Sequence, residues 1–215
     1  MKGNNAAFRL NPTTYMGQKL IYSYNAGKTM DGKDSLNETI NAKHLASQFS
    51  DSKRKCRIPL EFDLVPIAKY PAVVDLKILG AQGAYAQTSR KGAPIIAGWI
   101  PFINEDTNDA SKFGYIPANS VPGTVQYIFT VGLGGCTIVA VDRGPKGIYF
   151  YHEPTKAAWN NLPVYPDGNQ VLVRALPALA GSAIIRRSTT AAHGWEILVQ
   201  DANGFTSGGV TAYPV

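Results

Sequence analysis

The chain is poor in the residues on which disulfide-rich, zinc-binding and membrane-spanning proteins depend. It has two cysteines and three histidines among 215 residues, too few for a disulfide framework and without the spacing of a zinc site. No run of about 18 apolar residues occurs, so we expect no membrane span. The segment Met1–Leu10 lacks the apolar core of a signal peptide. We therefore expect a protein that works where thiols stay reduced.

Charged residues are also sparse, at 17% of the chain, whereas apolar residues make up 45%. The net charge is +6, from 21 basic and 15 acidic residues. This balance favours a partner with an acidic surface or a mild attraction to nucleic acid, although we do not expect nucleic acid as a direct ligand. The basic residues gather at Lys53-Arg54-Lys55 and Arg57. That cluster is either a solvated turn before a strand or a docking patch.

Short apolar runs separated by turn residues predict a strand-rich fold. We expect an α/β (α+β) protein with a mixed-strand β-sandwich core flanked by a few short helices, forming a single domain over residues 1–215. Residues 1–34 are interpreted as an irregular N-terminal arm with one strand at Lys19–Tyr24. A capping box at Ser35–Glu38 and a proline at Pro154 predict two helices. The predicted strands are Arg57–Leu64, Ala72–Leu79, Pro94–Ile103, Tyr127–Val131, Thr137–Val141, Ile148–Tyr151, Val171–Leu176, Ala183–Arg187, Trp195–Gln200 and Val210–Tyr213.

The candidate site lies where a glycine turn ends on a cysteine. If Thr137–Val141 and Ile148–Tyr151 pair as a hairpin, their far ends meet and bring His152 beside Cys136. An imidazole next to a thiol takes its proton and activates it as a nucleophile. Backbone N–H groups of Gly134 and Gly135 can then stabilise an oxyanion. The pattern predicts a cysteine–histidine amidohydrolase.

Two other residues could compete for these roles. His193 is the alternative base, but its sequence position does not bring it near Cys136. Cys56 starts a strand in the basic cluster, and we interpret it as a buried structural thiol.

The run Phe129–Cys136 resembles the Leu-Ser-Gly-Cys active-site signature of a group of toxin glutamine deamidases, the cytotoxic necrotizing factors and Burkholderia lethal factor. Thr130, six residues before the cysteine, matches the lethal-factor branch, as does His152 at the end of the next strand. Trp159 downstream and the segment Ala97–Pro101 upstream are similar as well.

One position departs from this signature, because its serine is Gly134 here. Any contribution of that serine to the oxyanion or to the turn must then pass to backbone N–H groups.

The resemblance implies that Cys136 attacks the side-chain amide of a glutamine in a host protein, with His152 as acid and base and Thr130 or a backbone carbonyl orienting the imidazole. Such a reaction needs no metal or organic cofactor. The implied target is a DEAD-box helicase acting in translation initiation, so translation is blocked, or else a Rho-family GTPase. The protein would be a monomeric bacterial toxin acting in the host cytosol.

Other functions fit the same residues. A cysteine peptidase or a transglutaminase-like acyl transferase would use the same Cys136 and His152. A non-catalytic strand-rich binding module would have a buried cysteine in a glycine hairpin and a ligand face made of Tyr149, Tyr151 and Trp159.

Overall fold

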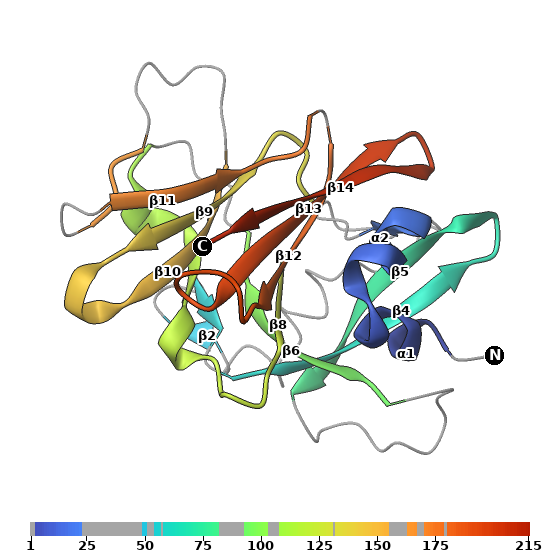
Figure 1. Cartoon of the computed structure of the whole chain (residues 1–215), viewed down its shortest axis with the longest axis horizontal. Coiled ribbons are helices and arrows are strands. Elements are labelled where there is room, and N and C mark those ends of the chain that lie inside the picture. The colour runs from blue at the N-terminus through green and yellow to red at the C-terminus, as the bar shows by residue number, and fades with distance from the viewer. Residues whose placement is uncertain are drawn as a thin grey trace.

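The fold is that of a computed structural model, which describes residues 3–22, 49–50, 54–56, 58–81, 93–102, 108–130, 132–154, 163–166, 170–178 and 180–215. The described part is mostly β, with 56% of residues in strands and two α-helices. Two sheets hold nearly all of the strands (Figure 1). The fold is therefore α+β with a β-rich core, as the sequence predicted.

The larger sheet has eight strands in the order β1–β5–β4–β6–β8–β12–β13–β14. It is mixed, because β1 pairs with β5 and β6 with β8 in parallel and the other neighbours are antiparallel. The strand bounds are Leu20–Tyr22 (β1), Leu60–Ile67 (β4), Tyr70–Ala81 (β5), Ile95–Ile100 (β6), Tyr127–Thr130 (β8), Gly181–Arg187 (β12), Trp195–Asn203 (β13) and Thr206–Pro214 (β14).

The smaller sheet has four antiparallel strands in the order β11–β9–β10–β7. The bounds of these strands are Gly114–Pro117 (β7), Thr137–Asp142 (β9), Ile148–Glu153 (β10) and Gln170–Ala175 (β11). A separate two-stranded ribbon pairs Phe49–Ser50 (β2) with Lys55–Cys56 (β3).

Two short helices occupy the N-terminal segment: Asn4–Leu10 (α1) and Pro12–Gln18 (α2). Asn11 caps α2, since its side chain accepts a hydrogen bond from the Thr14 backbone N–H at 3.0 Å. Helix α1 contacts β4 and α2 contacts β14, and both helices lie beside the larger sheet in Figure 1. The expectation of an irregular arm is therefore wrong over Asn4–Gln18.

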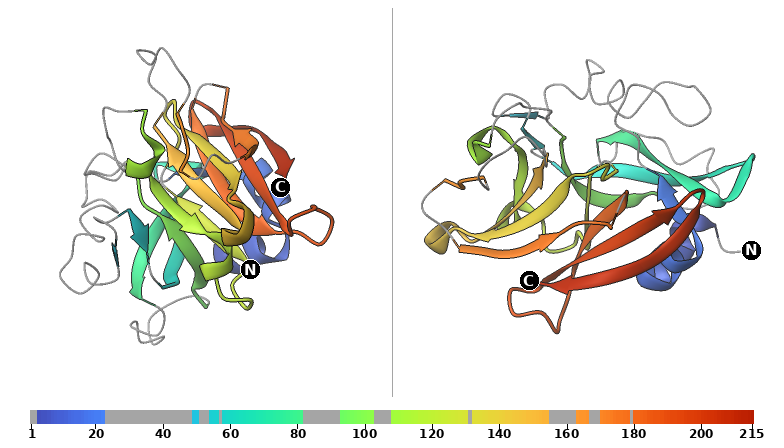
Figure 2. Two further views of the ribbon diagram at one scale, coloured as in Figure 1. Left: turned by 90° about the vertical axis from the view of Figure 1, so that its left-hand side faces the viewer. Right: turned by 90° about the horizontal axis from the view of Figure 1, so that it is seen from above.

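The larger sheet has the two helices packed on one face and the smaller sheet on the other, and Figure 2 shows these elements from two further sides. Residues of α1 and α2, such as Phe8, pack with Trp99 and Phe129 on one face of the larger sheet. The opposite face packs against the smaller sheet through a second cluster, which includes Ile128 and Phe150. We call this second cluster the inter-sheet core. A third cluster covers the outer face of the smaller sheet.

The predicted strands are confirmed in position, with bounds that differ by a few residues. The alternation that predicted them arises because successive side chains of a strand point to opposite faces. The helix predicted from Ser35 and most of the helix predicted from Pro154 lie outside the described residues. Within the described part, no helix is long and apolar enough to cross a bilayer.

Candidate active site

His152 lies on β10 and faces the inter-sheet core. Its Cα partner on β9 is Ile138, so the two side chains share one face of the smaller sheet. Ile138 belongs to the inter-sheet core. Thr130, the last residue of β8, reaches His152 from the larger sheet: its Oγ1 lies 2.7 Å from His152 Nδ1. The contact therefore joins the two sheets.

The hydrogen bonds of Thr130 determine the tautomer of the imidazole. Thr130 Oγ1 donates to the carbonyl oxygen of Ile100 at 2.9 Å, and a carbonyl can only accept. The single hydroxyl proton is thereby used, so Thr130 Oγ1 must accept from His152 Nδ1–H. Nε2 is left unprotonated, which is the form that a general base requires.

The imidazole is held in its neutral state. His152 is completely buried, and this burial lowers its pKa to about 3. Nε2 is also buried and has no hydrogen-bond partner among the described residues. The ring of Phe102 lies beside the imidazole, with 4.9 Å between the centroids. A buried acceptor without a partner is costly and points to a role beyond packing.

Cys136 precedes β9 at the end of the hairpin that carries His152. Its half-buried side chain packs against the inter-sheet core, the same side of the sheet that His152 faces. The β9–β10 ladder ends at the pair Thr137 and Glu153, so Cys136 lies one residue beyond it and two residues before Ile138, the partner of His152. The hairpin therefore places Cys136 and His152 near the same end of one sheet face. Nε2 makes no hydrogen bond to the sulfur in this structure.

The glycine turn before Cys136 is anchored on the larger sheet. Leu133 and Gly181 exchange two backbone hydrogen bonds, of 2.8 and 3.0 Å. Gly134 and Gly135 follow, both exposed, and a Cβ at either would meet nothing within 4 Å. Gly135 has a φ of +87°, which favours glycine. The turn therefore leaves open space beside Cys136 where a substrate carbonyl can approach.

The structure keeps the two competing residues away from this pair. Cys56 is buried and its Sγ donates to the carbonyl oxygen of Ile58 at 3.3 Å, as expected for a structural thiol. His193 is exposed in the turn after β12, whereas the cysteine turn bridges to Gly181 at the start of that strand. The length of β12 therefore separates His193 from the cysteine turn by about 20 Å. Trp159 lies outside the described residues.

Glu153 is the carboxylate next to His152 in the sequence, but it points away from His152. Being the next residue on β10, it faces the outer side of the sheet. There it accepts hydrogen bonds from Tyr165 and from Arg174 Nη1, the latter at 2.5 and 2.7 Å. Thr130 and Ile100, rather than a carboxylate, thus orient the imidazole.

Two neighbours of the site have no signal in the sequence: Phe102 and Gly181. Ile100 lies in the segment Ala97–Pro101 that carries part of the resemblance, but its contact with Thr130 depends on the pairing of β6 with β8, which local patterns do not reveal. Among the described residues, no group of three or more His, Cys, Asp or Glu side chains could hold a metal ion.

A comparison with known protein families finds no family model that matches the chain. A comparison with curated proteins finds no match either.

Proposed function

We propose that the chain is a protein glutamine deamidase in which Cys136 is the nucleophile and His152 the general base. The proposal depends mainly on one observation. The Nδ1 bond to Thr130 leaves a buried, unpartnered Nε2 on the sheet face that Cys136 also occupies. A neutral base beside a thiol on a glycine turn has the parts of an acyl-transfer site.

In the proposed reaction, the Cys136 sulfur attacks the carboxamide carbon of a glutamine side chain while its proton passes to His152 Nε2. The N–H groups of Gly134 and Gly135 are the candidate donors to the oxyanion. When the carbon–nitrogen bond breaks, His152 returns the proton and ammonia leaves. Water, deprotonated by Nε2, then cleaves the thioester to give glutamate and the free thiol.

Burial of His152 has a consequence for the first step. Because its pKa is about 3, a thiolate–imidazolium pair is disfavoured before the substrate binds. The proton therefore moves as the sulfur attacks, which is general-base catalysis.

The resemblance of Phe129–Cys136 to the toxin deamidases supplies the target class. We infer a host DEAD-box helicase that acts in translation initiation as the first candidate and a Rho-family GTPase as the second. Both would be met by a bacterial toxin in the host cytosol.

The test is incubation of the purified protein with each candidate target, followed by peptide mass spectrometry. Conversion of an amide to an acid adds about 1 Da. We expect this gain at one glutamine with the wild-type protein, and its loss with Cys136→Ala and His152→Gln. Cys56→Ala is the matched control and retains activity. Chain cleavage or incorporation of an added amine would instead indicate a peptidase or a transglutaminase. No covalent change in any target, with folded protein, would contradict the proposal.

A further inference from the structure

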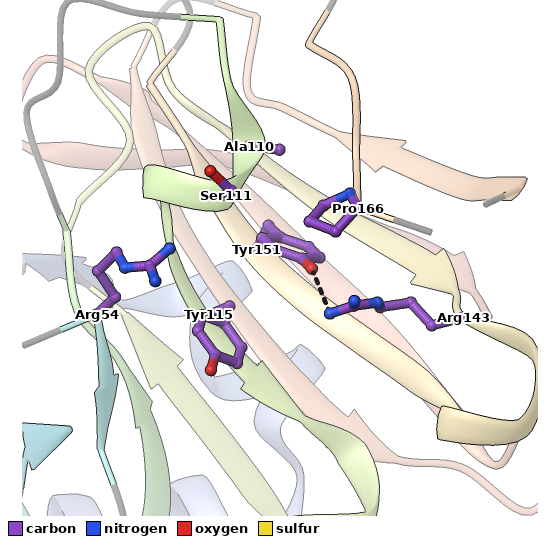
Figure 3. Close-up of a pocket in the computed structure, with 7 residues that line it drawn as sticks. All are labelled: Arg54, Ala110, Ser111, Tyr115, Arg143, Tyr151 and Pro166. Atoms are coloured by element: carbon purple, nitrogen blue, oxygen red, sulfur yellow. Dashed lines mark hydrogen bonds between the residues drawn. The ribbon is translucent and has the colours of Figure 1, made fainter. Parts of the chain in front are cut away.

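A second candidate site lies on the outer face of the smaller sheet, on the side opposite to His152. It is a cavity of about 120 Å³ lined by Arg54, Ala110, Ser111, Tyr115, Arg143, Tyr151 and Pro166 (Figure 3). The volume corresponds to about four water molecules. This volume suits a small anion.

Two guanidinium groups approach this cavity from opposite sides of the tyrosine rings (Figure 3). Arg54 precedes β3, and its carbonyl accepts the Tyr115 backbone N–H at 2.9 Å, which places it beside β7. Arg143 follows β9. The two cations are thus brought together by segments about 90 residues apart in the chain.

Aromatic rings hold both guanidinium groups. Arg143 lies over the Tyr149 ring at 4.4 Å and Arg54 over the Tyr115 ring at 5.9 Å. Tyr115 stacks on Tyr149 with 5.9 Å between centroids. Stacking engages the flat face of a guanidinium, whereas oxyanions bind at its edge. The rings therefore limit the motion of the cations while their edges can still bind an anion.

The hydroxyl group of Tyr151 adds an uncharged hydrogen-bond donor to the cavity. Arg143 Nη1 donates to the Tyr151 hydroxyl oxygen at 3.4 Å, so the hydroxyl proton is directed elsewhere. Burial raises the pKa of Tyr151 to about 12, so the hydroxyl keeps that proton at physiological pH. The exposed carboxylate of Asp109 lines the neighbouring hollow and accepts the Ser111 backbone N–H at 2.9 Å. Hydrogen bonding to Ser111 lowers the pKa of Asp109 most, and the charge of Arg54 contributes, so an anion must compete with this carboxylate for Arg54.

We propose that Arg54, Arg143 and Tyr151 bind a tetrahedral dianion, the phosphoryl group of a phosphate monoester or free phosphate. Two guanidinium charges match the charge of about −2 that such a group carries at neutral pH. It is independent of the thiol, so either proposal can fail while the other stands.

Calorimetric titration tests this site with four probes: inorganic phosphate, O-phosphotyrosine, dimethyl phosphate and acetate. We expect one of the first two to bind about tenfold or more tightly than the two singly charged probes. Preference for inorganic phosphate identifies free phosphate as the ligand, and preference for O-phosphotyrosine identifies a phosphorylated side chain. Equal affinity for all four probes, or no saturable binding, overturns the proposal.

The variants Arg54→Met and Arg143→Met are each expected to weaken phosphate binding about tenfold or more. Lys69→Met is the matched control, because Lys69 is an exposed cation that also lies over a tyrosine ring, Tyr70, at 5.4 Å. An equal loss in the control overturns the proposal. If a variant fails to fold, NMR of the wild-type protein is the alternative test. We expect added phosphate to shift the side-chain Nε–H signals of Arg54 and Arg143. Shifts confined to other residues overturn the proposal.

Discussion

At the scale of single residues, the candidate site depends on the hydrogen bond between Thr130 and His152. The hydroxyl of Thr130 bonds both the Ile100 carbonyl and Nδ1. The role often filled by a carboxylate is filled here by a neutral hydroxyl. A neutral partner does not stabilise an imidazolium by charge, which agrees with the lowered pKa of His152.

Thr130→Val removes the acceptor for Nδ1–H while keeping the shape of the side chain. A buried donor left without a partner costs about 1–3 kcal/mol, so the free energy of unfolding measured in urea falls by that amount. Thr211→Val, at an exposed position on β14, is the control and changes stability by no more than about 0.5 kcal/mol. Equal stability of the two variants would show that the Thr130 bond is unimportant.

The burial of His152 makes stability depend on pH in a definite direction. The folded-state pKa is about 3, below the ordinary value of 6.5, so below pH 6.5 the unfolded chain takes up a proton that the folded chain does not. His152 therefore contributes stability that is present above pH 6.5 and is lost as the pH falls toward 3, by about 1.4 kcal/mol per pH unit.

His152→Gln isolates this effect, since all other titrating groups are common to both proteins. The free energy of unfolding, measured at pH 7, 5 and 4, is expected to fall more steeply for the wild type than for the variant. Parallel slopes would mean that His152 takes up a proton readily in the folded protein, contrary to its burial.

At the scale of elements, two contacts position the candidate site. The register of β9 with β10 positions the His152 imidazole, and the bridge from Leu133 to Gly181 positions the glycine turn before Cys136. Gly181 has no room for a side chain, because a Cβ there would lie 1.8 Å from the Gln200 carbonyl oxygen on β13. The bridge that anchors the cysteine turn thus depends on a glycine in a neighbouring strand.

Gly181→Ala must push β12 away from β13 and displace the turn that precedes Cys136. We expect lower stability in thermal unfolding and reduced alkylation of Cys136 relative to the wild type. Gly123→Ala is the control, since a Cβ at Gly123 meets nothing within 4 Å. Wild-type behaviour of Gly181→Ala would contradict the described packing.

Strands that lie between two packed layers could be predicted because their side chains alternate between the layers, as Ile128 and Phe129 do on β8. The helices α1 and α2 were missed, since they have seven residues each and no acidic first turn. Packing of Phe8 holds them rather than helix propensity. Strand β7 was missed because four residues beginning with glycine and ending with proline give little periodicity.

The β9–β10 hairpin, which carries His152 and begins directly after Cys136, followed from the sequence because it depends on a short turn. The resemblance implied that Thr130 or a backbone carbonyl orients the imidazole, but which carbonyl contacts Thr130 could not be predicted, and neither could the Arg54–Arg143 cavity. Both arise where strands far apart in the chain become neighbours, and local patterns carry no information on that pairing.

At the scale of the whole molecule, the two candidate sites lie on opposite faces of the smaller sheet. His152 faces the inter-sheet core, whereas Tyr151, the preceding residue, faces the outer cavity. One layer thus separates a candidate catalytic pair from a candidate anion site, which is consistent with one face carrying out chemistry and the other binding a phosphorylated partner.

The most direct test of the central claim is the rate at which iodoacetamide alkylates Cys136 in the folded protein at neutral pH, followed by peptide mass spectrometry. Cys56, buried and bonded to a backbone carbonyl, is the internal reference. If His152 assists the thiol, Cys136 reacts faster than Cys56, and His152→Gln slows it about tenfold or more. An unchanged rate in His152→Gln, or a Cys136 as inert as Cys56, would contradict the account.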